Sequence, residues 1–511
     1  MQAFLRLLSA LIIVAPVLTS ADQRVTIAFT NDFESAYDPV AAYWRDDIDN
    51  IGGIAELATL VELIRSESDV FFLFDAGDIF TGTLARLTRG AVSFDLMALI
   101  GYDAMVIGNH EFEYGWQEFE AQQHRVPFPV LGSNLFYAGT THAFAKPYTI
   151  IERGGIRVGV VGILGQDAAT ALIPSNIAGL DVAKPTAVVR RWVQRLRDDC
   201  DLVIVLTHQG MTAPMQTDDE ADAAVQRGNA ANLELAGAVT GIDAILAGHT
   251  DAGTRTPLIH PATGTVVMQT FGQGQHLGVL EFVKGDDGGV SFESGRLVVV
   301  NADELEPSLP VAERLAEYRA QHADVYTVVG QLDAPLTRRY YAESSQGNAF
   351  ADIVRHAAGA DVGLMPSGAL RKDIAAGDVR RVDLLDAFPF EDRVARVVLP
   401  GSVLRDVLEQ GLSLERGFLQ LSGISIRYDL NQPIGQRLVE ALVGGAPLMD
   451  AQLYTVGTVE ILAKGGDRYT QFAAASDSEL LELGFGDALL AAFAGTRVSA
   501  PPIGRATAIE R

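Results

Sequence analysis

The chain contains a single cysteine, Cys200, in 511 residues. A disulfide within the chain is therefore impossible, and the fold has to be held by its packed cores. Because Cys200 precedes the apolar run 202–206, we expect its thiol to be buried. With 48% hydrophobic residues, the chain has enough apolar surface for at least two domains with complete cores.

Basic residues are also scarce. Lysine and arginine number 39 against 65 aspartates and glutamates, which gives a net charge of −26 at pH 7. Nucleic acids and anionic membranes bind to basic faces, so the composition argues against both as partners. An acidic protein that acts on an anionic substrate needs a local source of positive charge, and bound metal ions would supply it.

Long hydrophobic runs are missing beyond the N-terminus. Residues 1–21 have the pattern of a secretory signal peptide: Arg6, the apolar run 7–18, and then the small residues Thr19-Ser20-Ala21. The apolar run is too short to span a bilayer securely, and no lipid-anchoring cysteine follows it. We therefore predict a soluble, secreted, periplasmic protein without a membrane anchor. Its oligomeric state stays open.

From residue 25 onward, apolar runs of strand length alternate with amphipathic segments. The helical spacing is clear at Ile54, Leu57, Val61 and Ile64. This alternation predicts an α/β fold in which helices cover a parallel or mixed sheet. The strand candidates of this part are residues 25–30, 70–74, 104–107, 129–131, 158–163, 202–206, 244–246 and 266–269.

The pattern breaks around residues 304–310, which are acidic and contain two prolines. We predict a first domain over residues 22–307, a connector helix over 308–325 and a second α/β domain over 326–511. The second domain lacks histidine clusters. Its conspicuous loops are Ser367-Gly368-Ala369-Leu370-Arg371, Phe388-Pro389-Phe390 and Lys464-Gly465-Gly466-Asp467.

Side chains that can bind metal ions follow five of the predicted strands. The carboxyl ends of strands are where the loops of an α/β sheet converge, and a glycine beside a ligand allows the backbone to turn sharply. One histidine after a strand is more often hydrogen-bonded than metal-bound, but five such segments in succession indicate a hydrolytic site for two metals. The segments are Asn31-Asp32-Phe33-Glu34, Gly77-Asp78, Gly108-Asn109-His110, Thr207-His208 and Gly248-His249-Thr250-Asp251.

The order of these motifs resembles that of the calcineurin-like metallophosphoesterases. Together with the loops that contain Arg371 and Asp467, the range from about residue 25 to about residue 472 is similar to the exported 5′-nucleotidase family. That family also includes UDP-sugar hydrolases and cyclic phosphodiesterases. The resemblance implies a four-layer α/β/β/α sandwich and, joined to it by a helix, a second α/β domain that recognises the substrate.

The resemblance also implies two divalent metal ions that share Asp78 and activate a hydroxide between them. The family has histidine where this chain has Glu34, and histidine or glutamine where it has Asp251. Because carboxylates alone would then bind the first metal, we expect Mn²⁺, Mg²⁺ or Ca²⁺ rather than Zn²⁺. The alternative is that Glu34 faces solvent. The implied ligands are Asp32, Glu34, Asp78 and Asp251 for the first metal, and Asp78, Asn109, His208 and His249 for the second.

The resemblance gives the catalytic role to His110, which would donate a hydrogen bond to the phosphoryl oxygen or to the leaving group. Glu113 replaces the aspartate that partners this histidine in the family. It lies one helical turn after His110, so its carboxylate can orient the imidazole if a helix has begun there.

In the resembling family, the second domain holds the nucleoside between two aromatic rings. Here Phe390 matches one ring, Arg371 the family's arginine and Asp467 its carboxylate, whereas the second ring is replaced by Ile461. An aliphatic side chain loses a stacking contribution of about 1–3 kcal/mol per ring. Pro366 also stands where a polar residue is usual. The alternatives are a core position for Phe390 and a surface ion pair for Arg371.

These residues favour a periplasmic, dinuclear-metal phosphoesterase of 5′-nucleotidase type whose substrate is a small-molecule nucleotide. Three other functions stay open for the same fold. The first is hydrolysis of cyclic nucleotides or nucleotide sugars, and the second is hydrolysis of sulfur esters. The third is a binding protein with weakened catalysis, which the intact Asn109-His110 pair argues against.

Overall fold

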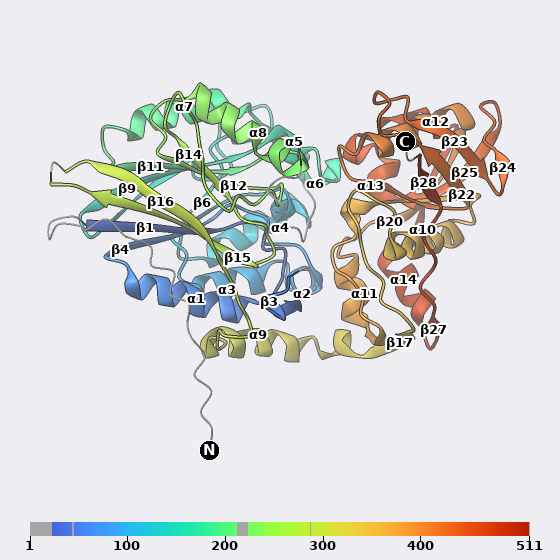
Figure 1. Cartoon of the computed structure of the whole chain (residues 1–511), viewed down its shortest axis with the longest axis horizontal. Coiled ribbons are helices and arrows are strands. Elements are labelled where there is room, and N and C mark those ends of the chain that lie inside the picture. The colour runs from blue at the N-terminus through green and yellow to red at the C-terminus, as the bar shows by residue number, and fades with distance from the viewer. Residues whose placement is uncertain (1–22, 43–44, 212–222, 287, 510–511) are drawn as a thin grey trace, which may run out of the picture.

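The computed structural model describes residues 23–42, 45–211, 223–286 and 288–509. The predicted signal peptide lies outside these ranges. None of the described helices is both long enough and apolar enough to cross a membrane. An N-terminal and a C-terminal domain lie side by side, and the connecting helix runs beneath the first of them (Figure 1).

Two six-stranded sheets form the centre of the N-terminal domain. The first contains, in spatial order, β16 (Val290–Val299), β15 (His276–Lys284), β1 (Gln23–Thr30), β4 (Val70–Asp75), β5 (Ala104–Val106) and β6 (Val130–Leu131). The second contains β13 (Leu258–Ile259), β14 (Val266–Gln269), β12 (Ala244–Gly248), β11 (Leu202–His208), β9 (Ile156–Leu164) and β8 (Tyr148–Arg153). The strands β1, β4 and β5 are parallel, as are β9, β11 and β12. Loops that follow parallel strands leave the sheet at one edge, which is why the predicted ligands can meet there.

The two sheets pack face to face, and helices cover their outer faces. Phe29 and Phe72 of the first sheet share a core with Val160 and Ile204 of the second. The helices α1 (Ile54–Glu67) and α3 (Ala91–Ile100) cover the first sheet, and α7 (Pro185–Leu196) and α8 (Ala223–Ala238) cover the second (Figure 1). The predicted α/β/β/α sandwich is thus confirmed. Cys200 is buried in the core beneath α7, also as predicted.

The connector is shorter than the predicted helix over residues 308–325. The helix α9 covers Leu309–Gln321, and a separate 3₁₀ turn, Ala323–Tyr326, follows it. Val311, Leu315 and Tyr318 are buried in the same core as α1 and α3. This helix therefore belongs structurally to the N-terminal domain, and the change of direction toward the second domain comes after it.

The C-terminal domain is also α/β and has one continuous core. Its main sheet contains β21 (Leu419–Ser422), β18 (Val362–Pro366), β25 (Leu453–Val459), β20 (Arg393–Pro400) and β26 (Asp477–Gly484). Two smaller sheets contain β24 (Ala446–Pro447), β23 (Leu438–Val443), β22 (Ile424–Tyr428) and β28 (Ala506–Ala508), and β19 (Gly377–Arg380), β17 (Val328–Leu332) and β27 (Arg497–Val498). The helices are α10 (Ser345–Ala358), α11 (Arg381–Ala387), α12 (Gly401–Ser413), α13 (Glu460–Ala463) and α14 (Phe485–Phe493).

Shorter elements complete the N-terminal domain and mostly border its loops. They are β2 (Pro39–Ala41), β3 (Asn50–Gly52), α2 (Thr83–Thr88), the 3₁₀ turns His110–Phe112 and Gln123–Arg125, α4 (Trp116–Gln122), β7 (Leu135–Tyr137), α5 (Gln166–Ala169), α6 (Pro174–Ile177) and β10 (Leu180–Val182).

Candidate active site

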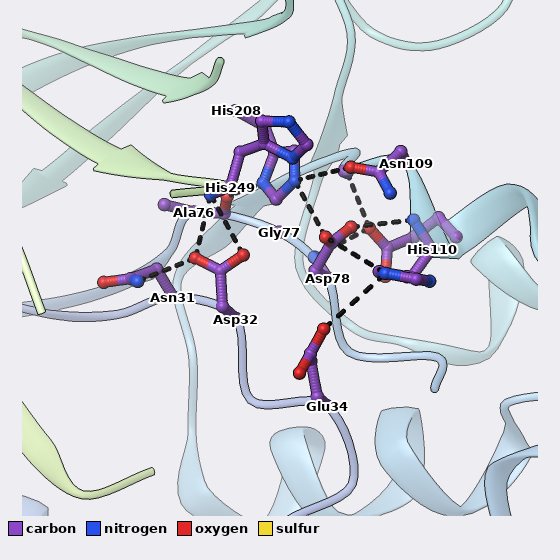
Figure 2. A network of polar contacts seen from close by, with 12 residues as sticks. Asn31, Asp32, Glu34, Ala76, Gly77, Asp78, Asn109, His110, His208 and His249 are labelled. Carbon is purple, nitrogen blue, oxygen red and sulfur yellow. Dashed lines mark hydrogen bonds and ion pairs between the residues drawn. The ribbon is translucent and has the colours of Figure 1, made fainter. Parts of the chain in front are cut away.

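Asp78 lies at the centre of the converging loops (Figure 2). Its Oδ2 atom lies 2.9 Å from Nε2 of His208, and its Oδ1 atom accepts a 2.7 Å hydrogen bond from the backbone N–H of His110. The side-chain oxygen of Asn109 lies 3.1 Å from the same Nε2 atom of His208. The loops after β4, β5 and β11 therefore meet at one carboxylate, as the predicted bridging position requires.

The ring of His208 is fixed from behind by the main chain. Its Nδ1 atom makes a 2.8 Å hydrogen bond with the carbonyl oxygen of Ala76, so Nε2 points toward Asp78 and Asn109. A hydrogen bond of this kind at one ring nitrogen is how metal-binding histidines are usually oriented. His208 is fully buried between the two sheets.

The loops after β1 and β12 meet at Asp32. Both carboxylate oxygens of Asp32 lie 2.9 Å from the backbone nitrogen of His249, which donates to them. Asp251 follows two residues later and lines the same cleft as Asp32 and Glu34. The three carboxylates predicted for the first metal, besides Asp78, thus line the same cleft.

Five of the seven predicted metal ligands have left-handed backbone conformations, although none of them is glycine. Residues with a side chain rarely adopt such φ values, and clusters of them occur at functional sites. The sharp turns aim short side chains back toward one point. The five are Asp32 (φ 48°), Glu34 (φ 46°), Asp78 (φ 64°), His249 (φ 83°) and Asp251 (φ 50°).

Three potential donor atoms are buried, and no hydrogen bond from the described part of the chain reaches them: Oε2 of Glu34, Nε2 of His249 and Oδ1 of Asp251. Ligand atoms of Asp78, His208 and His249 lie within 4.8 Å of one another, and so do those of Glu34, Asp78 and His110. Buried lone pairs without donors are what a metal ion satisfies. The side chains present therefore fit divalent cations.

The electrostatics of the cluster also call for positive charge. Burial, together with the neighbouring carboxylates Asp78 and Glu34, raises the pKa of Asp32 to about 7. Burial and the charges of Asp32 and Glu34 hold the pKa of Asp251 well above its usual range. Carboxylates crowded in this way ionise together only beside cations.

Glu111 connects two of the loops that carry predicted metal ligands, a role that was not predicted from the sequence. Its carboxylate accepts hydrogen bonds from the backbone N–H groups of Gly108 (2.6 Å), Asp78 (2.9 Å) and Ile79 (2.7 Å). Gly108 is required beside it, because a Cβ atom there would lie 2.2 Å from Oδ1 of Asp78. The only sequence signal was the position of Glu111 directly after His110.

His110 and Glu113 interact as predicted. The 3₁₀ turn that begins at His110 places Oε2 of Glu113 2.8 Å from Nδ1 of the imidazole. Burial acts to lower the pKa of His110, but the charge of Asp78 and the bond with Glu113 outweigh it and raise the pKa to about 9. The other ring nitrogen, Nε2, faces Glu34 at 3.6 Å and Nη2 of Arg371 at 3.1 Å.

The C-terminal domain reaches directly into this site. Arg371 forms an ion pair with Glu34, and its guanidinium lies 5.4 Å from the centre of the Phe390 ring. That ring stacks on His110 with 6.0 Å between the ring centres. Glu34 is only 5% exposed, so the alternative in which it faces solvent is wrong. Phe390 packs against the domain core and also lines the cleft.

The predicted site residues lie around one cleft between the domains. All thirteen of them line it except the fully buried His208. The cleft also contains side chains for which the sequence predicted no role, among them Asn176, Asp392 and Arg416. Arg416 crosses between the domains, since its Nη2 atom donates to the carbonyl oxygen of Asp167 over 3.1 Å. Their signal in the sequence was weak, because each comes from a different loop.

Comparison with known proteins agrees with both halves of this cleft. Residues 25–252 match the family model of the calcineurin-like phosphoesterases, and residues 325–474 match that of the 5′-nucleotidase C-terminal domain. The chain belongs to the 5′-nucleotidase family of calcineurin-like phosphoesterases. It is accordingly a metal-dependent phosphoester hydrolase.

The relatives of this 5′-nucleotidase-family hydrolase have low sequence identity to it, but they match most of its length. A trifunctional nucleotide phosphoesterase of Bacillus subtilis is 28% identical over 515 residues, which cover 89% of this chain but only 33% of that protein. The crystal structure of a 5′-nucleotidase precursor from Thermus thermophilus matches with a TM-score of 0.82 at 24% identity. The match covers 96% of this chain and 100% of the Thermus chain. A sulfate thiohydrolase of Thermus thermophilus, SoxB, has a TM-score of 0.76 at 19% identity, with coverage of 95% and 97%. At these identities the two structures establish the fold and leave the substrate open.

Proposed function

We propose that this chain is an exported nucleotidase that hydrolyses nucleoside 5′-phosphates with two divalent metal ions. The observation that carries the proposal is the contact of Arg371 with both Glu34 and His110. Through this contact the predicted substrate-binding residues and the predicted metal ligands line one cleft. A nucleotide can then present its phosphate to the N-terminal domain while the C-terminal domain holds its nucleoside.

The metal ligands would be those named from the sequence: Asp32, Glu34, Asp78 and Asp251 for one ion, and Asp78, Asn109, His208 and His249 for the other. When bound, such ions would supply positive charge to the phosphoryl oxygens and lower the pKa of a water molecule. The carboxylate-rich set around Glu34 favours Mn²⁺, Mg²⁺ or Ca²⁺.

Arg371 and His110 would act on the phosphate itself. The Arg371 guanidinium is a planar donor that suits phosphoryl oxygens, and it lies at the boundary between the metal ligands and Phe390. Glu113 holds Nδ1 of His110, so Nε2 faces the cleft and can give its proton to the leaving oxygen.

The nucleoside would lie farther along the cleft, against Phe390 and Ile461 and near Asp467. All three line the cleft, and Asp467 is partly buried there, under the influence of the positive charge of Arg416. A neutral, partly apolar nucleoside suits this end better than a second charged phosphate would. This chemistry supports nucleoside monophosphates over substrates without a nucleoside.

A substrate panel on metal-stripped protein tests the proposal. The protein is reconstituted separately with Mn²⁺, Mg²⁺, Ca²⁺, Co²⁺ or Zn²⁺ and assayed with nucleoside 5′-phosphates, cyclic nucleotides, UDP-glucose and a thiosulfonate ester. We expect the highest kcat/KM with 5′-monophosphates and with Mn²⁺, Mg²⁺ or Ca²⁺ present. A preference for the cyclic or sugar-linked substrates would replace the proposed substrate, and metal binding without turnover would favour a binding protein.

Export is tested separately from activity. Fractionation of cells that express the full chain, with N-terminal sequencing of the purified protein, should place it outside the cytoplasm and beginning at about residue 22. A cytoplasmic protein that still begins at Met1 would contradict export without affecting the enzymatic proposal.

A further inference from the structure

Arg371 contacts a predicted metal ligand as well as lining the cleft proposed for the substrate. Its Nη1 atom forms an ion pair with Oε1 of Glu34, a side chain that is 5% exposed. Among the described residues, no other group donates a hydrogen bond to this carboxylate. The orientation of a side chain in the N-terminal domain therefore depends on an arginine of the C-terminal domain.

The two oxygens of Glu34 have different surroundings. Oε1 is paired with Arg371, whereas Oε2 is buried and receives no hydrogen bond from the described part of the chain. Glu34, Asp78 and His110 offer ligand atoms within 4.8 Å of one another. Metal-binding carboxylates are commonly oriented by hydrogen bonds from neighbouring groups. The ion pair with Arg371 has this form, since it fixes the carboxylate and leaves one oxygen for a cation.

The C-terminal domain in turn holds Arg371 in place. The backbone N–H of Arg371 donates to the carbonyl oxygen of Ala387 over 3.0 Å, and its own carbonyl oxygen accepts a hydrogen bond from the guanidinium of Arg338. The guanidinium carbon of Arg371 lies 5.4 Å from the centre of the Phe390 ring, within cation–π range. A fixed guanidinium can restrict the long side chain of Glu34, which otherwise loses rotamer freedom when it binds a metal.

Arg371 has two opposite effects on a cation at the first metal site. Its positive charge repels the cation, which weakens metal binding. Its ion pair orients Glu34, which strengthens metal binding, and loss of a group that orients a metal ligand typically costs about 10–100-fold in affinity. Because Arg371 is paired with Oε1, the negative charge of the carboxylate stands between the guanidinium and a cation at Oε2. The repulsion is thereby reduced, and the orienting effect is the larger of the two.

We propose that Arg371 is a positioning residue for the first metal, because it holds Glu34 with Oε2 free for the cation. The proposal rests on the proposed function, in which Glu34 is a ligand of that metal. Coupling between two binding events is reciprocal. A cation at the first site therefore strengthens the contact between the domains, and loss of that contact weakens the site.

This role is compatible with binding of the substrate phosphate by the same arginine. A guanidinium has five N–H groups, and Arg371 also lines the cleft. Nη1 can stay paired with Glu34 while other N–H groups bind a phosphoryl oxygen. The phosphate and the ligand of the first metal are then held by one side chain.

The test is a titration of the metal-stripped full chain with Mn²⁺, followed by calorimetry in the absence of substrate. Wild type should bind two ions. In Arg371→Met we expect one ion to bind about tenfold or more weakly, and the ion at His208 and His249 to bind as before. Unchanged binding of both ions would overturn the proposal. Tighter binding would overturn it too, since that is the result of removing a repelling charge alone.

Arg416→Met is the matched control. Arg416 lines the same cleft and also crosses between the domains, but it donates to the carbonyl oxygen of Asp167. Within the described residues, no hydrogen bond or ion pair joins it to a predicted metal ligand. Its variant should bind both ions as tightly as wild type or more tightly. Weakening equal to that in Arg371→Met would assign the effect to domain contact in general and overturn the specific role of Arg371.

A double variant tests whether Arg371 acts through Glu34. In the background Glu34→Ala, the further change Arg371→Met should not weaken Mn²⁺ binding again, because the two side chains form one interaction. A second, additive loss would overturn the route through Glu34. Arg371→Lys keeps the positive charge without the planar fork, so it should recover part of the affinity lost in Arg371→Met.

Wild type alone provides a second test if Arg371→Met folds poorly. Residues 368–374 of the C-terminal domain contain no predicted metal ligand, yet their amide hydrogens should exchange more slowly with Mn²⁺ bound, because the coupling is reciprocal. Equal exchange with and without Mn²⁺ would contradict the proposal. Failure of the proposed function would look different: wild type would bind fewer than two ions or would hydrolyse no nucleoside 5′-phosphate.

Discussion

Arg371 of the C-terminal domain forms an ion pair with Glu34 of the N-terminal domain, across 337 residues of sequence. Glu34 is at the same time a predicted metal ligand, and its second carboxylate oxygen is buried without a donor among the described residues. The substrate-binding and metal-binding halves of the cleft thus meet at a single carboxylate. As a metal ligand, Glu34 would influence which metal the first site prefers.

Replacement of Glu34 by histidine should change the metal preference. An imidazole in place of a carboxylate moves the donor set toward Zn²⁺ or Co²⁺ and away from Mn²⁺. Metal content and activity are compared after reconstitution with Mn²⁺ or Zn²⁺, with Glu67→His at the exposed end of α1 as the control for an added histidine. An unchanged preference at wild-type occupancy would remove Glu34 from the metal site.

Asp78→Asn should lower metal content and abolish turnover. Asp78 contacts His208 and the backbone of His110 at 2.9 and 2.7 Å, so both proposed ions depend on its charge. Bound metal is measured per chain by elemental analysis, and thermal unfolding with and without Mn²⁺ shows whether the cation still stabilises the fold. Two ions per chain with normal turnover would contradict the dinuclear site.

The variant His110→Ala should still bind its metal ions but catalyse hydrolysis much more slowly. Removal of a positioned proton donor lowers kcat by about 10²–10⁴-fold while KM changes little. Glu113→Gln should have a smaller effect of the same kind, because it leaves the imidazole in place without its orienting carboxylate. His110 lies in one group with Glu34 and Asp78, so loss of metal in His110→Ala would make it a ligand instead.

Ile461→Phe should lower KM for adenine nucleotides. A second ring opposite Phe390 would add stacking worth about 1–3 kcal/mol. Such binding acts equally on the ground state and the transition state, so kcat should change little. Ile461→Leu controls for a change of shape without a ring. Weaker binding in the phenylalanine variant would mean that the base does not lie between residues 390 and 461.

Asp392→Asn should stabilise the metal-loaded protein more at high pH than at low pH. The folded-state pKa of Asp392 is about 8, against an ordinary value of 3.8. The folded protein therefore holds a proton that the unfolded chain has lost, and stability falls as the pH rises through this window, by up to about 1.4 kcal/mol per pH unit. Asparagine carries no such proton. Free energies of unfolding in urea at about pH 5 and about pH 9 measure the difference, and an equal effect at both values would contradict the buried, protonated acid.

Much of the N-terminal domain followed from the sequence alone, because strand patterns and strand ends are local features. The apolar runs before Asp32, Asp78 and His208 are strands in the structure, and the residues after them meet at one edge because parallel strands place their loops there. The strands β8 and β16 did not stand out, since both lie at a sheet edge and consist of partly or fully exposed residues instead of a fully buried run.

Tertiary structure alone decided how these residues combine. The left-handed backbone at Glu34 and Asp251 has no sequence signal, because residues with side chains adopt it only where surrounding contacts impose it. The clamp by Glu111 depends on backbone N–H groups, which every residue offers. The ion pair between Arg371 and Glu34 joins segments far apart in the chain. The sequence by itself determined the chemistry that each loop carries, whereas the packing of the two domains decided which of those groups share one cleft.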